Sequence, residues 1–352
     1  MKVAVVGAGA VGGWIGGRMA EAGTRVTLID AWPEHVSAMN TRGLTITEGG
    51  SQSTIAVNAL HVSQAQVLRR APVDIAFICT KLYDTDWATA LIAPYLAPGG
   101  FIVTLQNALV EERIAARVGW ERTVGCIGGG LFVGLRGPGQ IERSRKPGKS
   151  SGAAFTVGEV HGRITPRIER VKDLLMAADQ TKVTTNLWGE RWEKLVTNCM
   201  MSVLAGVSGL PLRELHADPA ARCVMTHLAA EAIVLGKRCG FLPGAVYGLA
   251  VESWVSAAQG DKGAQEATDT AFDAIHSVLD TGARSGTAQD LAADRQTEID
   301  YMNADIVERA RKVNLAVPTH EALVDIFRRI ERGDAHIGLA ALAALREHVF
   351  NG

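Results

Sequence analysis

A glycine-rich turn at the start of the chain restricts its possible folds more than any other feature. Lys2 to Val6 is a short apolar run of the kind that forms a buried strand. Gly7, Gly9 and Gly12 follow it at G-x-G-x-x-G spacing, and a helix rich in small residues continues to about Ala22. This strand, turn and helix predict the first unit of a doubly wound α/β domain.

Each glycine has a physical role in a dinucleotide-binding turn. Gly7 allows the tight turn, Gly9 lets backbone N–H groups approach a pyrophosphate, and Gly12 lets helix and strand pack closely. The phosphates would lie at the positive helix N-terminus, which Ala10 and Val11 form. We therefore expect these five residues to bind a dinucleotide, with a purely structural turn as the alternative.

Asp30 predicts which dinucleotide binds. It ends the second predicted strand, Arg25 to Ile29, about 20 residues beyond the glycines, where such sites carry an acidic residue. A carboxylate there accepts hydrogen bonds from a free ribose diol and repels a 2′-phosphate. NAD(H) is therefore favoured, although Arg25 or Lys81 could still neutralise the phosphate of NADP(H), and Asp30 could also be a solvated turn residue.

The composition narrows the possible partners. Lys plus Arg number 36 and Asp plus Glu 37, so no net field attracts nucleic acid or anionic membranes. The five cysteines lack C-x-x-C pairing and metal-like spacing with histidine, which predicts no metal site and a reducing compartment. The first residues lack a basic region followed by an apolar region, so we expect no secretory signal, and no apolar run reaches the roughly 18 residues of a membrane span. We therefore expect a cytoplasmic protein.

Alternating strand and helix patterns predict a mostly parallel Rossmann-type sheet in a dinucleotide-binding domain, residues 1–186. The strand over 73–81 ends on Lys81, and the strand over 101–107 ends on Asn107. Both ends belong to the sheet edge at which such folds bind ligands. The other predicted elements are helices over 33–42, 84–96 and 165–178, a hairpin or edge insertion within 44–62, and a strand over 182–185.

Glycine-spaced strands from Thr123 onward are expected to continue the sheet as antiparallel edge strands. They cover residues 124–134, 139–145 and 153–160. The basic segment RKPGKSSG, residues 145–152, predicts an exposed loop between the last two.

Residues 187–352 predict an all-helical second domain. Polar, glycine-containing stretches at 257–270 and 281–286 indicate a mobile connection around a short helix. Ala- and Leu-rich helices in this domain leave a homodimer open. The predicted helices cover 187–209, 218–239, 243–258, 288–314, 318–332 and 336–350.

Two ionisable residues of the helical half draw attention. Lys194 and Asn198 are four apart and share a helix face within an apolar run. Such a lysine either extends to the surface or places a cation in a cleft, and the residues alone leave both open. The role of Glu298 is equally undecided from the residues alone, because exposed helical glutamates are common.

Six motifs occur in order along the chain and together resemble the ketopantoate reductase family. They are GAGAVGG at 7–13, CTK at 79–81, LQN at 105–107, RWEKLVTN at 191–198, QD at 289–290 and TEID at 297–300. The resemblance spans nearly the whole chain. It implies a Rossmann-type domain, a helical domain, and an active site in the cleft between them.

The resemblance also implies an activity, the NAD(P)H-dependent reduction of a 2-oxo acid to a 2-hydroxy acid, or the reverse oxidation. Lys194 would be the general acid that protonates the carbonyl oxygen, and Glu298 would bind the substrate hydroxyl and hold the lysine. Asn107 would lie near nicotinamide and substrate, and Asn198 would bind the substrate.

The chain departs from the family pattern at three places. Ser202 replaces a second asparagine, and Gly286 replaces a serine that helps to hold the substrate carboxylate. Possible substitutes nearby are Ser285, Thr287 and Arg284. NADP-using members tend to carry a basic residue near the position of Asp30, and the segment before Gly286 is longer than usual. The substrate side therefore includes Ser202, Ser285 and Gly286 as candidates.

Two alternatives remain. One is an authentic NADPH-dependent 2-dehydropantoate 2-reductase, which a comparison of NADH and NADPH turnover would separate. The other is a non-catalytic dinucleotide-binding sensor, against which the presence of both Lys194 and Glu298 argues.

Overall fold

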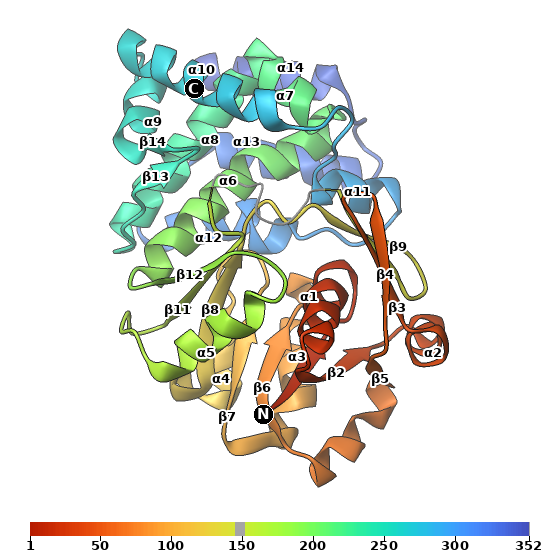
Figure 1. The fold of residues 1–352 in the computed structure, drawn as a ribbon. Helices are drawn as coiled ribbons and strands as arrows, with labels where there is room; N and C mark the ends of the chain where they lie inside the picture. The colour runs from red at the N-terminus through yellow and green to blue at the C-terminus, as the bar shows by residue number, and fades with distance from the viewer. Residues whose placement is uncertain (145–151, 352) are drawn as a thin grey trace. The chain divides into compact units, whose positions relative to one another are not determined.

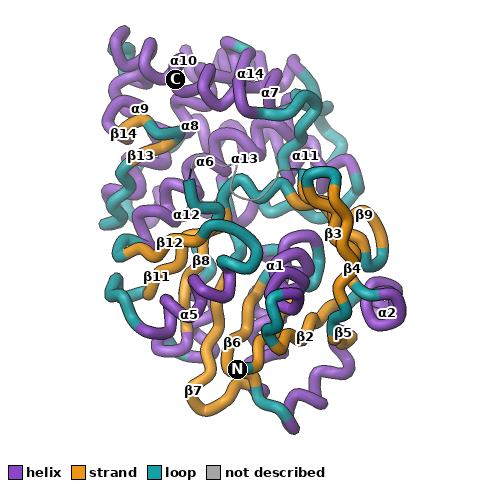
Figure 2. Tube along the Cα trace, in the orientation of Figure 1, coloured by secondary structure: helices purple, strands orange, loops and turns teal. Residues whose placement is uncertain are grey.

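The computed structural model describes residues 1–144 and 152–351, without the side chains of residues 350 and 351. It divides into two compact units, Met1–Leu187 and Trp188–Gly352. Figures 1 and 2 show long strands in the first unit and mainly helices in the second. Of the predicted loop RKPGKSSG, residues 145–151 lie outside the described residues.

An eight-stranded sheet forms the centre of the N-terminal unit, in the order β12-β11-β8-β7-β6-β1-β2-β5. All neighbours from β5 to β8 are parallel, β8 and β11 are antiparallel, and β11 and β12 are parallel. This confirms the predicted, mostly parallel α/β sheet. The strands are β1 (Lys2–Val6), β2 (Arg25–Asp30), β5 (Asn58–His61), β6 (Val73–Ile78), β7 (Leu96–Thr104), β8 (Thr123–Gly128), β11 (Phe155–Glu159) and β12 (Thr181–Thr184).

In the described part of this unit, the α-helices that accompany the sheet are α1 (Ala10–Glu21), α2 (Pro33–Arg42), α3 (Thr85–Ile92), α4 (Glu111–Val118) and α5 (Pro166–Leu175). The predicted helix over 84–96 is too long. It ends at Ile92 and continues only as a 3-10 turn, because Pro94 lacks the N–H that the next helical bond requires.

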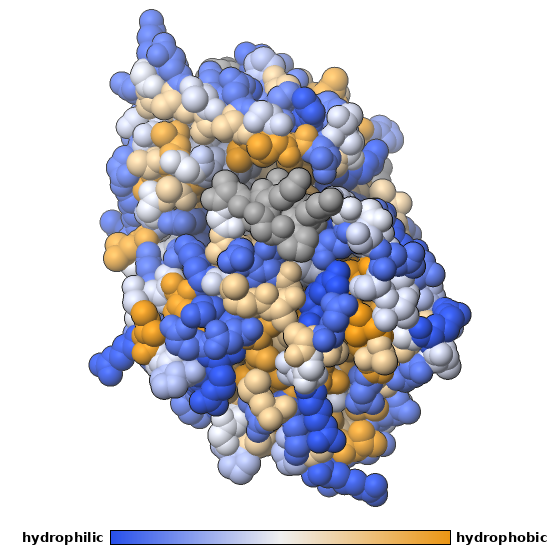
Figure 3. Space-filling model, in the orientation of Figure 1, coloured by the Kyte–Doolittle hydropathy of each residue, from blue (hydrophilic) through white to orange (hydrophobic). Residues whose placement is uncertain are grey.

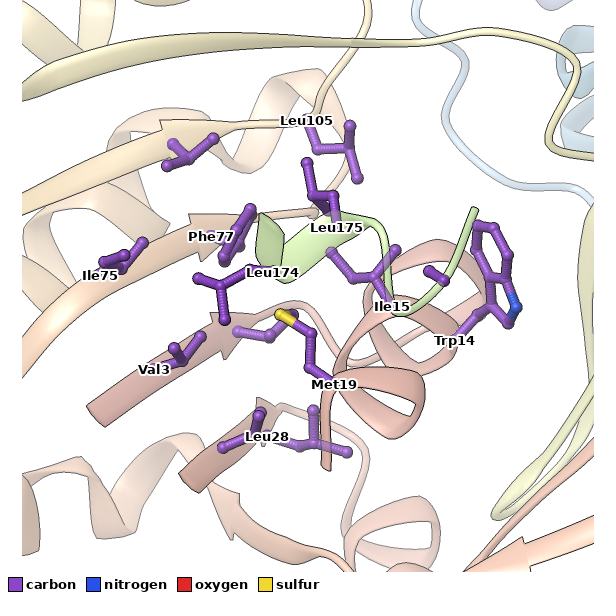
Figure 4. Packing of buried hydrophobic residues seen from close by; sticks show 14 of the residues in the cluster. Val3, Trp14, Ile15, Met19, Leu28, Ile75, Phe77, Leu105, Leu174 and Leu175 are labelled. Carbon is purple, nitrogen blue, oxygen red and sulfur yellow. The ribbon is translucent and has the colours of Figure 1, made fainter. Parts of the chain in front are cut away.

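The core of the unit fixes α1 against the sheet. Figure 4 shows Ile15 and Met19 of α1 among side chains of the sheet and of α5, including Phe77 and Leu174. Ile15, Met19 and Phe77 are fully buried. Burying side chains of this size stabilises the fold by about 1.5–3 kcal/mol each, so the start of α1 is firmly positioned.

A second sheet has the order β4-β3-β10-β9. Its hairpin of β3 (Leu44–Glu48) and β4 (Ser51–Ile55) confirms the hairpin predicted there. The other two strands, β9 (Val133–Gly137) and β10 (Gln140–Arg143), were expected at the edge of the main sheet, and that prediction is wrong. β9 is only partly buried, whereas β8 is buried on both faces and pairs in parallel with β7 inside the main sheet.

A buried arginine ties the second sheet to the rest of the unit. The Arg143 side chain is 1% exposed and donates to Glu48 at 2.7 Å and to Asp179. Its guanidinium also lies 4.4 Å from the ring centroid of Trp14 on α1. Because a buried cation is tolerated only when it is paired, this contact set fixes the second sheet beside α1.

Helices form nearly all of the second unit, as predicted. Within the described residues, no helix is both long and apolar enough to span a membrane. The helices are α6 (Leu187–Ser208), α7 (Leu212–Ala217), α8 (Pro219–Arg238), α9 (Val251–Ala258), α10 (Lys262–Val278), α11 (Gly286–Ala292), α12 (Asn303–Lys312), α13 (Pro318–Glu331) and α14 (Leu339–Asn351).

The predicted helix over 243–258 is wrong in its first half. A two-stranded ribbon, β13 (Ala245–Val246) and β14 (Leu249–Ala250), precedes α9. Tyr247 and Gly248 connect the two strands with φ values of 53° and 75°, which no α-helix can contain.

The mobile connection predicted within 257–286 is also wrong in its main part, because α10 is a regular helix of 17 residues. The Asp261 side chain caps it by accepting the N–H of Ala264 at 2.7 Å. Phe272 is fully buried and packs edge to face with Trp254 at 5.3 Å between centroids. Gly260, which suggested a flexible loop, instead ends the preceding helix with a φ of 92°.

The single helix predicted over 288–314 is interrupted between α11 and α12. Asp294 adopts a φ of 50°, and the N–H of Arg295 returns to the carbonyl of Asp290 at 2.9 Å. A left-handed residue closing a helix end is usually glycine or asparagine, and this stretch contains no glycine or proline to reveal the break.

Candidate functional site

The glycine turn joins the carboxyl ends of three strands. Gly7 follows β1 with a φ of 87°, and the N–H groups of Gly7 and Ala8 both donate to the carbonyl of Ile29, at 2.9 and 3.3 Å. A Cβ on Gly7 would lie 2.8 Å from the backbone nitrogen of Thr80, just beyond β6. Both the backbone conformation and the close approach therefore require glycine.

Gly12 and Gly9 differ sharply in their surroundings. A Cβ on Gly12 would lie 2.0 Å from the carbonyl oxygen of Gly7, so this glycine is needed for packing. A Cβ on Gly9 would meet no described heavy atom within 4 Å. Gly9 therefore has free space at the position that a Cβ would occupy.

Helix α1 begins after Gly9, which has no side chain to cap the helix. Gly9 is the N-cap of α1 and has no side chain that could accept a hydrogen bond from the helix, while Ala10 and Val11 begin the first turn. The N–H groups of a first helical turn need partners from outside the helix, and the helix dipole favours an anion. These residues fit the pyrophosphate of a dinucleotide, which Gly9, Ala10 and Val11 would hold.

The other candidates of this unit lie at the same edge of the sheet. Asp30 is the last residue of β2, Lys81 follows β6, and Asn107 follows β7. The strand order places β2, β1, β6 and β7 side by side, so these residues end neighbouring strands. The Asp30 carboxylate accepts the N–H of Trp32 at 3.0 Å. Lys81 is half-buried and Asn107 is exposed.

Gln106 is a residue of this edge to which the sequence analysis gave no role. Its side-chain amide is buried and donates to the carbonyls of Thr80 at 3.0 Å and of Lys81 at 3.1 Å. It therefore fixes the loop after β6 to the loop that carries Asn107. The signal was present in the LQN motif, where an amide residue follows an apolar strand.

In the helical unit, three candidates share one face of α6. Lys194, Asn198 and Ser202 are spaced four residues apart, so they lie one above another on the helix. Asn198 and Ser202 are buried, and Lys194 is half-buried. Burial lowers the pKa of Lys194, because removal from water disfavours the charged ammonium. A lysine that releases its proton more easily than usual suits a proton donor.

The start of α11 lies beside Ser202. The Ser202 and Thr287 hydroxyls are 3.0 Å apart, and the Ser285 hydroxyl donates to the carbonyl of Ser202 at 2.8 Å. Ser285 also caps α11 by accepting the N–H of Ala288 at 3.1 Å. The one hydrogen of the Ser285 hydroxyl is thus engaged, whereas the Ser202–Thr287 pair keeps one hydrogen for another acceptor.

Gly286 is exposed at the same helix start. A Cβ there would meet no described heavy atom within 4 Å, and its φ is not in the left-handed range. A serine would therefore fit at this position without strain. The structure brings Ser202, Ser285 and Gly286 together at the start of α11.

Glu298 lies in the interruption between α11 and α12 and is buried. Two contacts fix this segment. Arg295 donates to the Asp290 carboxylate at 3.0 Å, and Asn303 at the start of α12 donates to the carbonyl of Cys199 on α6 at 2.9 Å. Cys199 follows Asn198 directly, so α12 is anchored beside a candidate substrate residue.

Asn303 is a second residue whose role the sequence did not predict. It is fully buried, and its position at a helix start would have suggested only a capping residue. In the described part of the chain, no three or more His, Cys, Asp or Glu side chains are grouped to hold a metal ion.

Comparison with known proteins identifies the family. Residues 3–153 match the family described as ketopantoate reductase PanE/ApbA, and residues 186–331 match its C-terminal part. The chain belongs to the ketopantoate reductase family. A 2-dehydropantoate 2-reductase from Mesorhizobium japonicum is 26% identical over 359 aligned residues, which cover 95% of this chain and 99% of the relative.

Solved structures have the same fold. A PanE/ApbA family ketopantoate reductase from Ralstonia eutropha aligns with a TM-score of 0.77 and 25% identity, and the alignment covers 96% of this chain and 100% of that chain. A D-mandelate dehydrogenase with NADH and anilino(oxo)acetate aligns with a TM-score of 0.76 and 21% identity, covering 98% and 99%. The family fold thus extends over both units, including the segments between the matched motifs.

Proposed function

We propose that this chain is an NAD(H)-linked member of the ketopantoate reductase family that reduces a 2-oxo acid to a 2-hydroxy acid, or catalyses the reverse oxidation. Family members are oxidoreductases acting on the CH–OH group of a 2-hydroxy acid.

The N-terminal unit holds the cofactor through its backbone. The N–H groups around Gly9, Ala10 and Val11 donate to the pyrophosphate, and Asp30 accepts hydrogen bonds from the adenosine ribose. Asp30 is the reason for preferring NAD(H), because its charge repels a 2′-phosphate. Lys81 and Asn107 bind toward the nicotinamide end. When bound, the reduced nicotinamide supplies a hydride to the carbonyl carbon of the substrate.

The helical unit supplies the proton. Lys194 donates a proton from Nζ to the carbonyl oxygen, and its ammonium stabilises the negative charge that develops there. In the oxidation direction the neutral amine accepts the hydroxyl proton. Glu298 accepts a hydrogen bond from the substrate hydroxyl and positions the lysine, and Asn198 donates to the substrate.

The substrate carboxylate needs donors, and α6 with α11 can provide them. The Ser202–Thr287 hydroxyl pair retains one hydrogen, and backbone N–H groups begin α11 at Gly286. Ser285 supports this arrangement through its bonds to Ser202 and Ala288. We assign Ser202 and Gly286 to the carboxylate and Ser285 to their support.

The observation that carries the proposal is Lys194, a lysine with a pKa lowered by burial on the same helix face as Asn198 and Ser202. The test is a screen of 2-oxo and 2-hydroxy acids against both cofactors. We expect turnover with NADH and at least one 2-oxo acid. Binding of NADH without turnover of any acid would favour the sensor alternative.

A second candidate is the NADPH-dependent reduction of 2-dehydropantoate. It is favoured by the relative from Mesorhizobium japonicum, which is named 2-dehydropantoate 2-reductase. The D-mandelate dehydrogenase with a similar fold is instead described with NADH and an aryl-substituted oxo acid. Turnover of 2-dehydropantoate with NADPH exceeding that with NADH would favour the second candidate.

The cytoplasmic location and the homodimer stay predictions. On the face seen in Figure 3, hydrophobic side chains form separate small groups among hydrophilic ones. This face therefore does not indicate where a second copy would bind. Size-exclusion chromatography with light scattering would give the oligomeric state.

A further inference from the structure

We propose that His35 is a positioning residue for the dinucleotide, holding the Gly7–Ala8–Gly9 turn in the conformation that presents its N–H groups. The inference rests on the proposed binding of a dinucleotide at this turn. It concerns a residue of α2 that none of the family motifs includes.

His35 connects the turn to the second sheet. Its side chain is fully buried in the first turn of α2, and Nε2 lies 2.9 Å from the carbonyl oxygen of Ala8. On the other side of the ring, the N–H of Gly139 donates to Nδ1 at 2.9 Å. Gly139 lies between β9 and β10, and Figure 1 shows α2 beside this sheet.

The two bonds determine the state of the imidazole. A backbone N–H can only donate, so Nδ1 must be the acceptor and carries no hydrogen. The hydrogen is then on Nε2, which donates it to Ala8. A neutral histidine offers one donor and one acceptor on opposite sides of a rigid ring, which is what this position requires.

The bond to Ala8 orients the next peptide group. In a trans peptide the C=O of one residue and the N–H of the following residue point in opposite directions. Holding the Ala8 carbonyl toward His35 therefore directs the Gly9 N–H away from α2. The N–H groups of Gly7 and Ala8 are already bonded to Ile29, so the Gly9 N–H is the first one of the turn left for a phosphate.

The same histidine is in contact with the residues at the ribose position. Trp32 stacks on the His35 ring at 5.6 Å between centroids with an interplanar angle of 15°. The backbone N–H of Trp32 donates to the Asp30 carboxylate at 3.0 Å. One short stretch of chain, from Asp30 to His35, thus connects the acidic residue to the turn.

The test compares substitutions of His35 with a matched substitution on the same helix. Asn40 of α2 also makes two bonds to main chain, donating to the carbonyl of Ala59 at 2.8 Å and accepting its N–H at 3.0 Å. These bonds reach β5 and not the turn. Asn40→Ala is therefore a control for loss of two polar contacts from α2.

We expect His35→Ala to raise the Kd for NADH about tenfold while kcat at saturating NADH stays within about twofold, because an unpaired buried carbonyl loosens the turn. His35→Gln, whose amide provides a donor and an acceptor, should restore most of the affinity. His35→Phe keeps the ring and its stacking but should bind NADH as weakly as His35→Ala. Asn40→Ala should lower Tm and leave the Kd unchanged.

Equal NADH affinity in wild type, His35→Ala and His35→Phe would overturn the inference and leave His35 a structural residue. If His35→Ala does not fold, the comparison of His35→Gln with His35→Phe decides, since equal affinities of those two would overturn it as well. Wild-type protein that binds neither NADH nor NADPH would overturn the proposed function itself, and this outcome is seen before any variant is made.

Discussion

The two units build their candidate sites from different materials. In the N-terminal unit, backbone N–H groups and the space left by missing side chains form the candidate phosphate-binding part of the site, within one stretch of sequence around Gly9. In the helical unit, side chains form it, and they come from α6, from the start of α11 and from the interruption at Glu298. The first site depends on backbone shape and the second on side-chain chemistry.

This difference determines what substitutions should do. A side chain added in the glycine turn obstructs a ligand or the fold, but removes no reacting group. A side chain removed from α6 leaves the helix intact and removes a proton donor or a hydrogen-bond donor. Binding and turnover should therefore respond separately to changes in the two units.

The largest effect is expected at Lys194. Lys194→Ala should lower kcat by about 10²–10⁴, the usual contribution of a positioned general acid. Lys194→Arg keeps the positive charge but does not release a proton near neutral pH, so it should recover little of the loss. Steady-state rates with both variants, with Tm measured for each, check this. An arginine variant with near wild-type turnover would show that charge alone is required.

The pH dependence should follow from the lowered pKa of Lys194. Reduction needs the ammonium, so its rate should fall tenfold per pH unit above that pKa. Oxidation needs the amine, so its rate should rise tenfold per pH unit below that pKa and level off above it. Because burial lowers the pKa, the midpoint should lie below about 10.4, the ordinary value for lysine. Profiles of kcat against pH in both directions measure it, and parallel changes in the two directions would exclude Lys194 as the titrating group.

A smaller effect is expected at Asp30, where the N-terminal site does use a side chain. Asp30→Asn removes the repulsion of a 2′-phosphate and should shift the NADPH-to-NADH ratio of kcat/KM about tenfold toward NADPH. Asp74→Asn is the matched control, because Asp74 binds the backbone nitrogen of Lys2 at the opposite edge of the sheet. An equal shift in both variants would indicate a general charge effect.

The smallest effect is expected at Ala108, next to Asn107. Ala108 is buried and has a φ of 55°, a conformation that favours glycine. Ala108→Gly relieves this strain but adds flexibility to the unfolded chain, so the free energy of unfolding should rise by only about 0.5 kcal/mol. Urea denaturation measures the change. A clear loss of stability would mean that packing of the Ala108 methyl group stabilises the fold more than the backbone strain destabilises it.

The same contrast explains how much the sequence could predict. The glycine turn, the strands β1, β2 and β6, and the residues that end them follow from local pattern, because a βαβ unit is specified by contiguous residues. The hairpin of β3 and β4 was equally local. The pairing of β10 with β3, which places β10 and its neighbour β9 in the second sheet, was not predictable, because it depends on a partner about 95 residues away that no periodicity reveals.

In the helical unit one of the wrong predictions lies beside a candidate site residue. The break at Asp294, which precedes the Glu298 segment, involves neither glycine nor proline. Only the φ of Asp294 and the return of the Arg295 N–H to Asp290 mark it. α10 was missed because Gly260 suggested a loop, whereas the burial of Phe272 decides that the helix forms. The residues themselves, Lys194 and Glu298, were singled out by resemblance to the family, since residue pattern alone left them undecided.

We assign cofactor binding to the N-terminal unit and the proton donor to the helical unit. Titrating NADH into Gly9→Val and Lys194→Ala side by side tests this assignment most directly. A Cβ on Gly9 meets no described heavy atom within 4 Å, so Gly9→Val should fold normally and obstruct only the ligand. We predict that Gly9→Val weakens NADH binding at least about tenfold, whereas Lys194→Ala binds NADH like wild type and has lost turnover. Unchanged binding in Gly9→Val, or lost binding in Lys194→Ala, would contradict the account.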